Sequence, residues 1–336
     1  MLLVVSNADS DTHETPAWHP ERPSRSAAVV RGLRAAGLDD ALVWVEPREA
    51  TMSELSVVHD PAYLSVLERR CASGGGAFDA DTIVSAGSWR TAKLAAGGGI
   101  MACEELIAGR ASAAFVVARP PGHHASRARA MGFCVVNNIA VAAAWLADRG
   151  ERVLIVDWDV HHGNGTQDLF WDDPRVFYVS THGGHLFPGT GAWDEVGGPL
   201  ARGTTLNVPL PPGTTGDAML AAFDEVIAPE VERFAPTWVL VSAGFDAHRS
   251  DPLADLSLSA GDFALMAERV TRWAPPDRIV LFLEGGYDLD ALAGSAVPAA
   301  AATLGVAHVT EAPSSGSSGR DAVDDLVRRR ARRESD

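Results

Sequence analysis

The chain has 336 residues, of which 46% are hydrophobic and 21% are charged, and this balance predicts a globular protein with a sizeable core. Its formal net charge of −16 argues against the basic surface of a nucleic-acid binder, so we expect no nucleic-acid partner. Arginines do gather at 328–333, but acidic residues flank them on both sides. An acidic body weakly favours cationic substrates.

The three cysteines, Cys71, Cys103 and Cys134, lie far apart and form no CxxC pair. This spacing argues against disulfides and against a cysteine zinc site, so we expect a reducing, cytoplasmic setting. The N-terminal apolar run is too short for a signal peptide, and no stretch reaches the roughly 18 apolar residues of a membrane span. We therefore expect no membrane contact, whereas a homo-oligomer is compatible with the sequence.

Short apolar runs alternate with segments of helical spacing along the chain. The runs lie at 2–6, 113–118, 152–157, 175–180, 237–244 and 278–286, and the helical segments at 22–36, 88–108, 138–149, 217–234, 259–273 and 289–304. Nearly continuous apolar runs are typical of strands buried on both faces of a parallel sheet. The alternation predicts an α/β fold with three layers, α/β/α, around a mostly parallel central sheet.

One domain is predicted for residues 1–310, because no internal repeat or linker interrupts them. The last segment, 311–336, opens with Ser and Gly and ends in a run of charges. Such a composition favours a flexible tail, with the charged end either a frayed helix or disordered.

Four of the predicted strands run directly into polar segments at their carboxyl ends. These segments are RPPGHHA (119–125), DWDVHHGNG (157–165), FDAH (245–248) and EGGYD (284–288). Ligands of open parallel sheets sit at this edge, so we expect the four segments to form one site.

Asp159 and His161 are candidate ligands for one metal ion. At strand spacing, Asp157, Asp159 and His161 project to the same side of the chain. Asp246, at the end of another predicted strand, is the best candidate for the third ligand. Two carboxylates and one imidazole leave an open position for catalysis, and these oxygen donors suit Fe²⁺ as well as Zn²⁺. A single Asp after a strand is more often a helix cap, so the prediction depends on the combination.

The adjacent residues His123 and His124 can divide proton transfer between them if each has a different partner. Asp157 and Asn164 are the candidate partners. A carboxylate partner favours imidazolium, whereas an amide cannot supply that charge, so the two imidazoles would differ in pKa. The alternative interpretation is a loop in which Pro-Pro-Gly only makes a turn.

Tyr287 follows two glycines at the end of the last predicted strand, and the chain has only three tyrosines. In that position its hydroxyl can donate to a carbonyl oxygen on which negative charge develops. Taken alone, the sequence GGY is more typical of an ordinary strand-to-helix turn.

Together, RPPGHHA, DWDVHHGNGTQ, SAGFDAHRSDPL and EGGYDL resemble the motifs of the histone deacetylase superfamily, which has the arginase/deacetylase fold. The resemblance extends from HPERP (19–23) through 284–289 and covers most of the chain. WDVHHGNGTQ is similar to class II enzymes and their bacterial relatives, because class I enzymes usually carry Asp at the position of Asn164. The resemblance implies a zinc-dependent amidohydrolase that removes acetyl or other acyl groups from lysine side chains.

The resemblance also implies a role for each motif residue. The three metal-ligand candidates would bind zinc. His123 would pair with Asp157, and His124 would pair with Asn164 and act as the general base. Tyr287 would polarise the carbonyl that is cleaved.

A narrow channel for the stem of an acyl-lysine is implied as well. Gly132 and Phe133 in MGFCVVNN and Phe187 in LFPGTG match its aromatic walls, although each phenylalanine taken alone is typical of core packing. Arg25 matches an arginine that lines an internal exit for acetate. Leu253 stands where polyamine-selective relatives carry an acid, and this favours acyl-lysine over the alternative substrate, an acetylated polyamine.

The family also binds K⁺ or Na⁺, largely through backbone oxygens. The positions that match the inner site are Asp157, Asp159, His161, Ser180 and Thr181. The positions that match the outer site are Phe170, Asp173 and Val176.

Two further hypotheses remain open at this point. A non-catalytic protein that binds acyl-lysine is disfavoured because every catalytic position is filled. A ureohydrolase of the arginase type shares the fold but uses two manganese ions, and the segment HHGNG offers no second group of acids for them.

Overall fold

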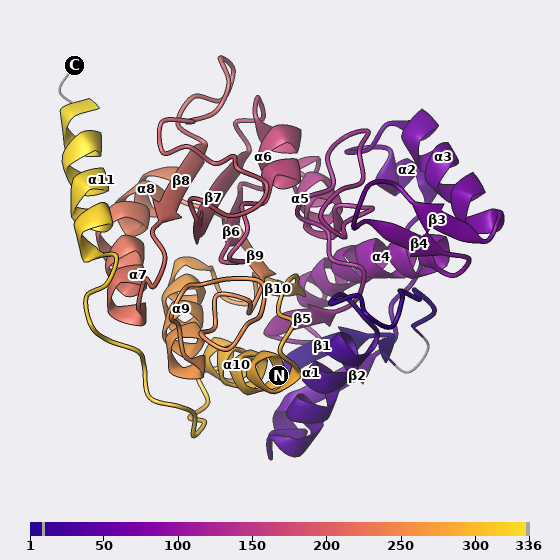
Figure 1. Ribbon diagram of the computed structural model, residues 1–336, viewed down its shortest axis with the longest axis horizontal. Coiled ribbons are helices and arrows are strands. Elements are labelled where there is room, and N and C mark those ends of the chain that lie inside the picture. The colour runs from indigo at the N-terminus through magenta and orange to yellow at the C-terminus, as the bar shows by residue number, and fades with distance from the viewer. Residues whose placement is uncertain (9–10, 334–336) are drawn as a thin grey trace.

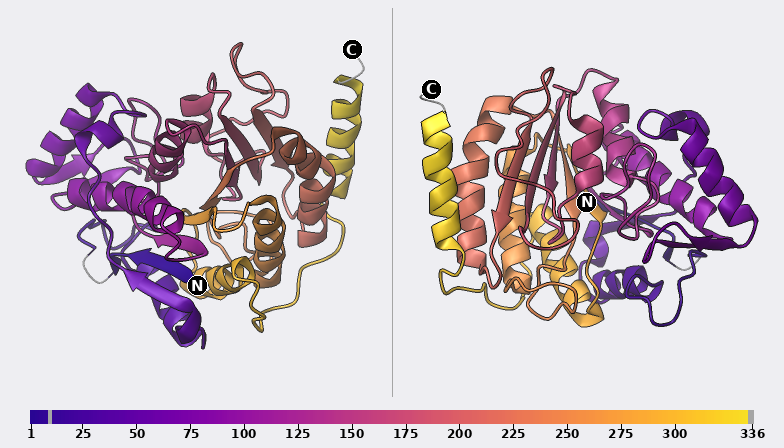
Figure 2. Two further views of the ribbon diagram at one scale, coloured as in Figure 1. Left: turned by 180° about the vertical axis from the view of Figure 1, so that it is seen from behind. Right: turned by 45° about the horizontal axis from the view of Figure 1, so that its top comes forward.

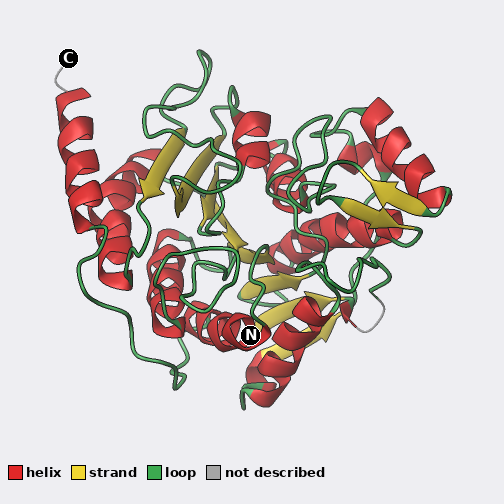
Figure 3. Cartoon of the chain, in the orientation of Figure 1, coloured by secondary structure: helices red, strands yellow, loops and turns green. Residues whose placement is uncertain are grey.

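The computed structural model describes residues 1–8 and 11–333. Its centre is a sheet of eight parallel strands in the order β2-β1-β5-β10-β9-β6-β7-β8 (Figures 1 and 3). The strands are β1 (Leu2–Ser6), β2 (Leu42–Val45), β5 (Ala113–Val117), β6 (Val153–Asp157), β7 (Val176–Gly183), β8 (Thr205–Leu210), β9 (Trp238–Ala243) and β10 (Ile279–Leu283). A small antiparallel pair, β3 (Gly75–Ala77) and β4 (Ile83–Ser85), lies apart from this sheet.

Apolar side chains pack on both faces of the sheet, as strand alternation requires. In β1, Leu2 and Val4 belong to one buried cluster, whereas Leu3 and Val5 belong to the other. The first cluster is covered by α1 (Ser24–Ala35), α7 (Gly216–Ala222), α8 (Ala228–Phe234), α9 (Ala260–Trp273) and α10 (Leu289–Thr303). The second is covered by α3 (Pro61–Ala72), α4 (Ser88–Ile107) and α5 (Asn138–Ala147). Figure 2 shows the strands between the two groups of helices, which confirms the three-layer α/β/α prediction.

All the predicted strands and helical segments are present, and one segment differs in detail. The helix expected at 217–234 is divided by a π-helical turn, η3 (Phe223–Ile227), between α7 and α8. The edge strands β2 and β8 escaped prediction. In β8, Asn207 and Pro209 interrupt the apolar run, and an edge strand tolerates a proline because one side of its ladder is unpaired.

The four strands that run into the polar segments are consecutive neighbours, in the order β5-β10-β9-β6. All four are parallel, so their carboxyl ends meet at the same edge of the sheet. Asp157, for example, is the last residue of β6 and pairs with Ser242 near the end of β9. The fold therefore brings the four predicted segments together at the middle of that edge.

Residues 320–333, the charged end of the tail, follow the helical alternative of the prediction and not the disordered one. They form helix α11 (Arg320–Arg333), which lies beside α7 (Figure 1) and buries Val323 and Leu326 in the core cluster of that face. Ion pairs join Arg320 to Glu225 at 2.7 Å and Arg330 to Glu230 at 2.5 Å. Only a few apolar side chains of α11 face the core. They stand among charged residues in the sequence, which hides the amphipathic pattern of the helix. Residues 334–336 lie outside the described part, and the domain boundary at 310 stays a prediction.

The shorter helices are η2 (Asp39–Ala41), α2 (Met52–Leu55) and α6 (Asn164–Phe170). Within residues 1–8 and 11–333, no helix is both long and apolar enough to cross a membrane.

Docking of α11 can be tested with Leu326→Ala, which removes a side chain that is 5% exposed. We expect the free energy of unfolding to fall by about 2 to 5 kcal/mol, because the change leaves a cavity under the helix. Chemical denaturation measures this loss. Arg328→Ala is the matched control on the exposed side, where its ion pair with Asp325 spans 3.6 Å, and should change stability by less than about 0.5 kcal/mol. Equal, small effects of both changes would mean that the helix does not dock.

Candidate active site

Asp159, His161 and Asp246 converge on one point at the carboxyl edge of the sheet. Their potential ligand atoms all lie within 4.8 Å of one another. Nδ1 of His161 lies 3.2 Å from Oδ1 of Asp159 and 3.1 Å from Oδ2 of Asp246. One imidazole nitrogen and two carboxylate oxygens at this spacing fit a single divalent cation.

Asp159 and His161 come together for a different reason from the predicted strand alternation. Strand β6 ends at Asp157, and the chain then bends. Oδ1 of Asp157 accepts the backbone N–H of Asp159 at 3.2 Å, and Oδ1 of Asp159 accepts that of His161 at 2.9 Å. Such side-chain-to-backbone bonds two residues apart form local turns. Asp157 belongs to the site but is not one of the three grouped ligands.

The second oxygens of the two carboxylates are held by backbone N–H groups from neighbouring segments. Asp159 accepts the N–H of Gly285 at 2.7 Å, and Asp246 accepts that of Val160 at 2.9 Å. Position 285 admits only glycine, because a Cβ there would lie 2.0 Å from an oxygen of Asp246. These bonds fix the direction in which each carboxylate presents its other oxygen.

The charge distribution of this cluster favours a bound cation. Burial, and then the neighbouring Asp159 carboxylate, raise the pKa of Asp246 to about 7. Burial alone would lower the pKa of His161, but its hydrogen bonds to Asp159 and Asp246 raise it to about 10. Two buried carboxylates therefore need a positive charge between them, and a divalent cation supplies it without requiring the imidazole to be protonated.

His123 and His124 have the two partners that the resemblance implied. Nδ1 of His123 donates to Oδ2 of Asp157 at 3.0 Å, and Nδ1 of His124 donates to Oδ1 of Asn164 at 2.9 Å. The rings lie 4.0 Å apart between centroids, and both are buried. Because Nδ1 of each ring makes this hydrogen bond, the other ring nitrogen, Nε2, takes no part in it.

The two imidazoles differ strongly in basicity. Burial opposes charge on both, but the Asp157, Asp159 and Glu284 carboxylates raise the pKa of His123 well above its usual value. Burial and the nearby His123 and His161 hold the pKa of His124 well below its usual value. One protonated and one neutral imidazole therefore stand side by side.

Tyr287 lines the same pocket. Its backbone N–H donates to Asp251 at 2.7 Å, and its ring lies 4.8 Å from the guanidinium of Arg25. Arg25 is fully buried and donates to the carbonyl oxygens of Gly286, at 2.6 Å, and of Glu284. Burial raises the pKa of the Tyr287 hydroxyl well above its usual value, so it stays protonated and able to donate.

A pocket of about 240 Å³ opens onto these groups. Gly132 and Phe133 have φ angles of 54° and 68°, and this left-handed turn brings Gly132 so close to His124 that a Cβ would lie 2.4 Å from its ring. Phe187 packs edge-to-face on His124 with centroids 5.1 Å apart. The lining consists of Asp81, His124, Gly132, Phe133, His161, Phe187, Leu253 and Tyr287.

The positions that the family resemblance matches to monovalent cation sites form an inner group and an outer group. Ser180 pairs with Asp157 across adjacent strands, and the hydroxyl of the buried Thr181 has no hydrogen-bond partner. The outer positions share one turn, in which Asp173 N–H donates to the carbonyl oxygen of Phe170 and Val176 N–H to that of Asp173. Cation binding at either group stays a prediction.

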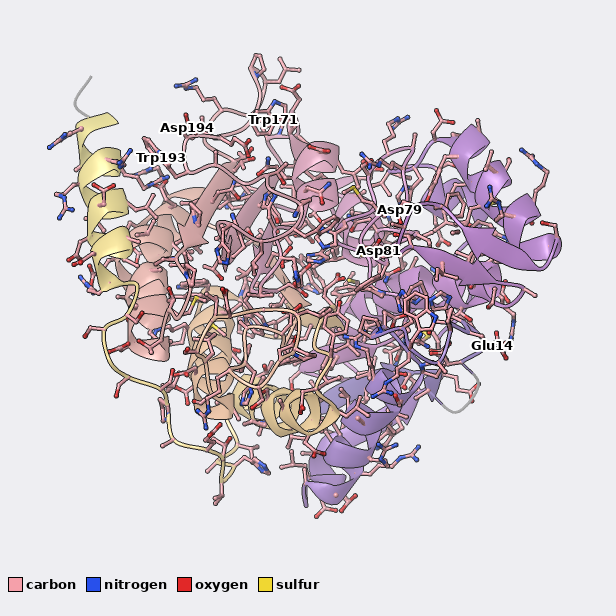
Figure 4. The ribbon with its side chains drawn as sticks, in the orientation of Figure 1. Glu14, Asp79, Asp81, Trp171, Trp193 and Asp194 are labelled. Carbon is pink, nitrogen blue, oxygen red and sulfur yellow. The ribbon has the colours of Figure 1, made fainter. Side chains whose placement is uncertain are left out.

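Three residues of the site, Glu284, Tyr178 and Asp81, were not predicted from the sequence. Oε2 of Glu284 accepts the backbone N–H of Gly122 at 2.7 Å and of His123 at 3.2 Å. Tyr178 donates from its hydroxyl to Asp157 at 3.1 Å. Asp81, on the β3–β4 loop, lines the pocket, and Figure 4 labels it beside Asp79. Glu284 stood within a recognised motif, but a loop aspartate and a tyrosine inside a buried strand carry no sequence signal.

The comparisons with known proteins agree on one family. The model of the histone deacetylase domain matches residues 19–303. A probable deacetylase of Archaeoglobus fulgidus is 40% identical over 293 residues, which cover 85% of this chain and 81% of the relative. A histone deacetylase-like amidohydrolase of Pseudomonas aeruginosa is 38% identical over 277 residues, covering 81% of this chain and 73% of the relative. The crystal structure of the HDA15 HD domain superposes with a TM-score of 0.89 at 36% identity, over 97% of this chain and 93% of that chain.

The metal cluster can be tested with Asp246→Asn, which keeps the shape of the side chain but removes its charge. We expect Zn²⁺ affinity, measured by calorimetric titration, to fall by roughly 100-fold or more because one of three ligands is lost. Asp255→Asn, at an exposed carboxylate on the same loop, is the control and should bind Zn²⁺ like the native chain. Unchanged affinity in Asp246→Asn would place the ion elsewhere.

Proposed function

The chain belongs to the histone deacetylase family, and we propose that it is a zinc-dependent hydrolase that removes acyl groups from lysine side chains. The observation that carries the proposal is the juxtaposition of the Asp159–His161–Asp246 cluster with a neutral imidazole and a protonated phenol at one pocket. When bound in this cluster, the ion supplies Lewis-acid polarisation of the amide carbonyl and of a water molecule.

His124 is the general base of the proposed reaction. The oxygen of Asn164 can only accept, so the proton of the neutral ring sits on Nδ1 and the lone pair on Nε2. With its low pKa, the ring is unprotonated at neutral pH and can take a proton from the attacking water. His123, held as imidazolium by Asp157, stabilises the negative charge that develops next to it.

Tyr287 donates its hydroxyl proton in a hydrogen bond to the oxyanion that forms from the amide carbonyl. Its backbone is held by Asp251, and Arg25 holds the carbonyl oxygens of the segment just before it. The phenol is therefore positioned before the substrate arrives. The proton collected by His124 then passes to the leaving amine, which completes the hydrolysis to a free amine and a carboxylate.

The shape of the pocket supports a linear N-acyl alkylamine as substrate. The side chains of Phe133 and Phe187 form part of the pocket wall, and an apolar wall suits a chain of methylenes in the substrate. At the outer end, Phe187 is 43% exposed and Leu253 is 38% exposed. An apolar rim favours a lysine side chain presented by a peptide or protein over a free polyamine.

One observation favours the second candidate, an acetylated polyamine. Asp81 lines the pocket and can pair with a second ammonium group of the substrate. Burial, followed by a hydrogen bond and charge repulsion from Asp79, raises the pKa of Asp81, whereas the exposed rim of the pocket at Phe187 and Leu253 is apolar. Acyl-lysine therefore remains the preferred substrate.

The two substrates can be compared directly on the zinc-loaded protein. We expect kcat/KM for an acetyl-lysine peptide to exceed that for acetylputrescine by at least about 10-fold, because the apolar rim contacts only the peptide. The control is Leu253→Glu, which adds an acid at the rim and should narrow the ratio. A clear preference of the native chain for acetylputrescine would reverse the ranking.

The role of the phenol predicts that Tyr287→Phe lowers kcat by roughly 10²- to 10³-fold with little change in KM, because the lost hydrogen bond forms in the transition state. Steady-state kinetics on an acetyl-lysine peptide measures the effect. Tyr63→Phe is the matched control, since that hydroxyl donates to the carbonyl oxygen of Val135 at 2.6 Å, away from the pocket lining. A kcat of Tyr287→Phe within about threefold of the native value would remove Tyr287 from the mechanism.

A further inference from the structure

His162 is the second histidine of the DVHHG motif, and the proposed mechanism does not use it. Its side chain is 1% exposed, although it directly follows a candidate metal ligand. Its ring nitrogens have two partners: Nδ1 lies 2.8 Å from Oγ1 of Thr190, and Nε2 lies 3.1 Å from Oε1 of Gln167. Thr190 stands three residues after Phe187 in the loop that joins β7 to β8.

The partners determine which nitrogen of His162 carries the proton. Oε1 of Gln167 is an acceptor, because it also accepts from Nδ2 of Asn207 at 2.7 Å while Nε2 of Gln167 donates to Glu195 at 2.8 Å. Nε2 of His162 is therefore the donor. Nδ1 of His162 is therefore an acceptor, and the hydroxyl of Thr190 donates a hydrogen bond to it.

A second buried histidine holds the next residue of the same loop. Nε2 of His182 donates to the carbonyl oxygen of Gly191 at 3.1 Å, and its Nδ1 accepts from the hydroxyl of Ser180 at 2.9 Å. The rings of His162 and His182 lie 4.8 Å apart between centroids. Gly191 has a φ of 87°, and a Cβ there would lie 2.5 Å from His182, so the loop follows these rings closely.

The loop is thus held on its inner side by the two imidazoles, while Thr190 and Phe187 are both exposed. These inner contacts, together with the packing of Phe187 on His124, determine where the phenylalanine stands in the pocket wall. Farther along, Glu195 is bound by Gln167 and Asn207, and Trp193 lies under the guanidinium of Arg329. Figure 4 labels Trp193 and Asp194 at the upper edge of the molecule, between α11 and Trp171.

We propose that the hydrogen bond from Thr190 to His162 is a latch that positions the Phe187 wall of the pocket relative to the metal-ligand segment. His162 and Thr190 are then positioning residues for the stem of the substrate, and this assignment rests on the proposed function. The wall contacts the stem before and during the reaction, so the latch contributes to KM and leaves the chemical step unchanged.

Thr190→Val tests the latch, because valine keeps the shape of threonine but leaves Nδ1 of His162 without a donor. We expect KM for an acetyl-lysine peptide to rise by about 3- to 10-fold with kcat within about twofold of the native value. Thr190→Ser keeps the hydroxyl and should restore the native KM. Thr204→Val is the matched control at the other end of the loop, where Oγ1 of Thr204 donates to the carbonyl oxygen of Ala201 at 2.7 Å, and it should leave KM unchanged.

A native KM in Thr190→Val, or a loss confined to kcat, would overturn the latch, as would an equal rise of KM in Thr204→Val. Hydrogen exchange of segment 184–203 provides a measurement that does not depend on turnover. Faster exchange in Thr190→Val but not in Thr190→Ser supports the latch, and identical exchange in the two contradicts it. If the native chain cleaves no acylated amine, the proposed function fails, and the exchange experiment alone decides on the latch.

Discussion

The structure depends on holding two buried carboxylates, Asp159 and Asp246, around a single imidazole at the end of a parallel sheet. In the protein interior such a cluster is costly unless every oxygen has a partner. Backbone N–H groups of Gly285 and Val160 satisfy one oxygen of each carboxylate, and the other two oxygens converge toward His161. Burial and the repulsion that remains raise the pKa of Asp246, and a divalent cation bound here would relieve both costs.

The same edge of the sheet supplies the rest of the chemistry because the four contributing strands are neighbours. His123 is hydrogen-bonded to a carboxylate and His124 to an amide, and this difference favours a positive charge on His123 rather than on His124. The carboxylates of Asp157, Asp159 and Glu284 raise the pKa of His123. Burial and the neighbouring imidazoles lower the pKa of His124, so the charged form is favoured on His123 only. In the proposed mechanism, this difference in surroundings is what makes His124 the general base and His123 the electrostatic helper.

Much of this arrangement was predictable from the sequence, and the failures have physical causes. Continuous apolar runs identified the buried strands, but β8 was missed because Asn207 and Pro209 break its pattern at the sheet edge. Asp159 and His161 were predicted to lie together, yet side-chain-to-backbone turns beyond the strand bring this about. The hydrogen bond that the backbone N–H of His123 donates to Glu284 joins residues far apart in the chain, and no local pattern encodes it.

In the proposed active site, one divalent ion is bound by two carboxylates and one imidazole. X-ray absorption spectroscopy of the zinc-loaded protein tests it most directly. We expect the ion to be surrounded by nitrogen and oxygen atoms only, at the roughly 2.0 to 2.2 Å typical of such ligands, with scattering from a single imidazole. A sulfur atom at about 2.3 Å would place the ion instead at the neighbouring group of His123, Cys134 and Glu284 and would contradict the account.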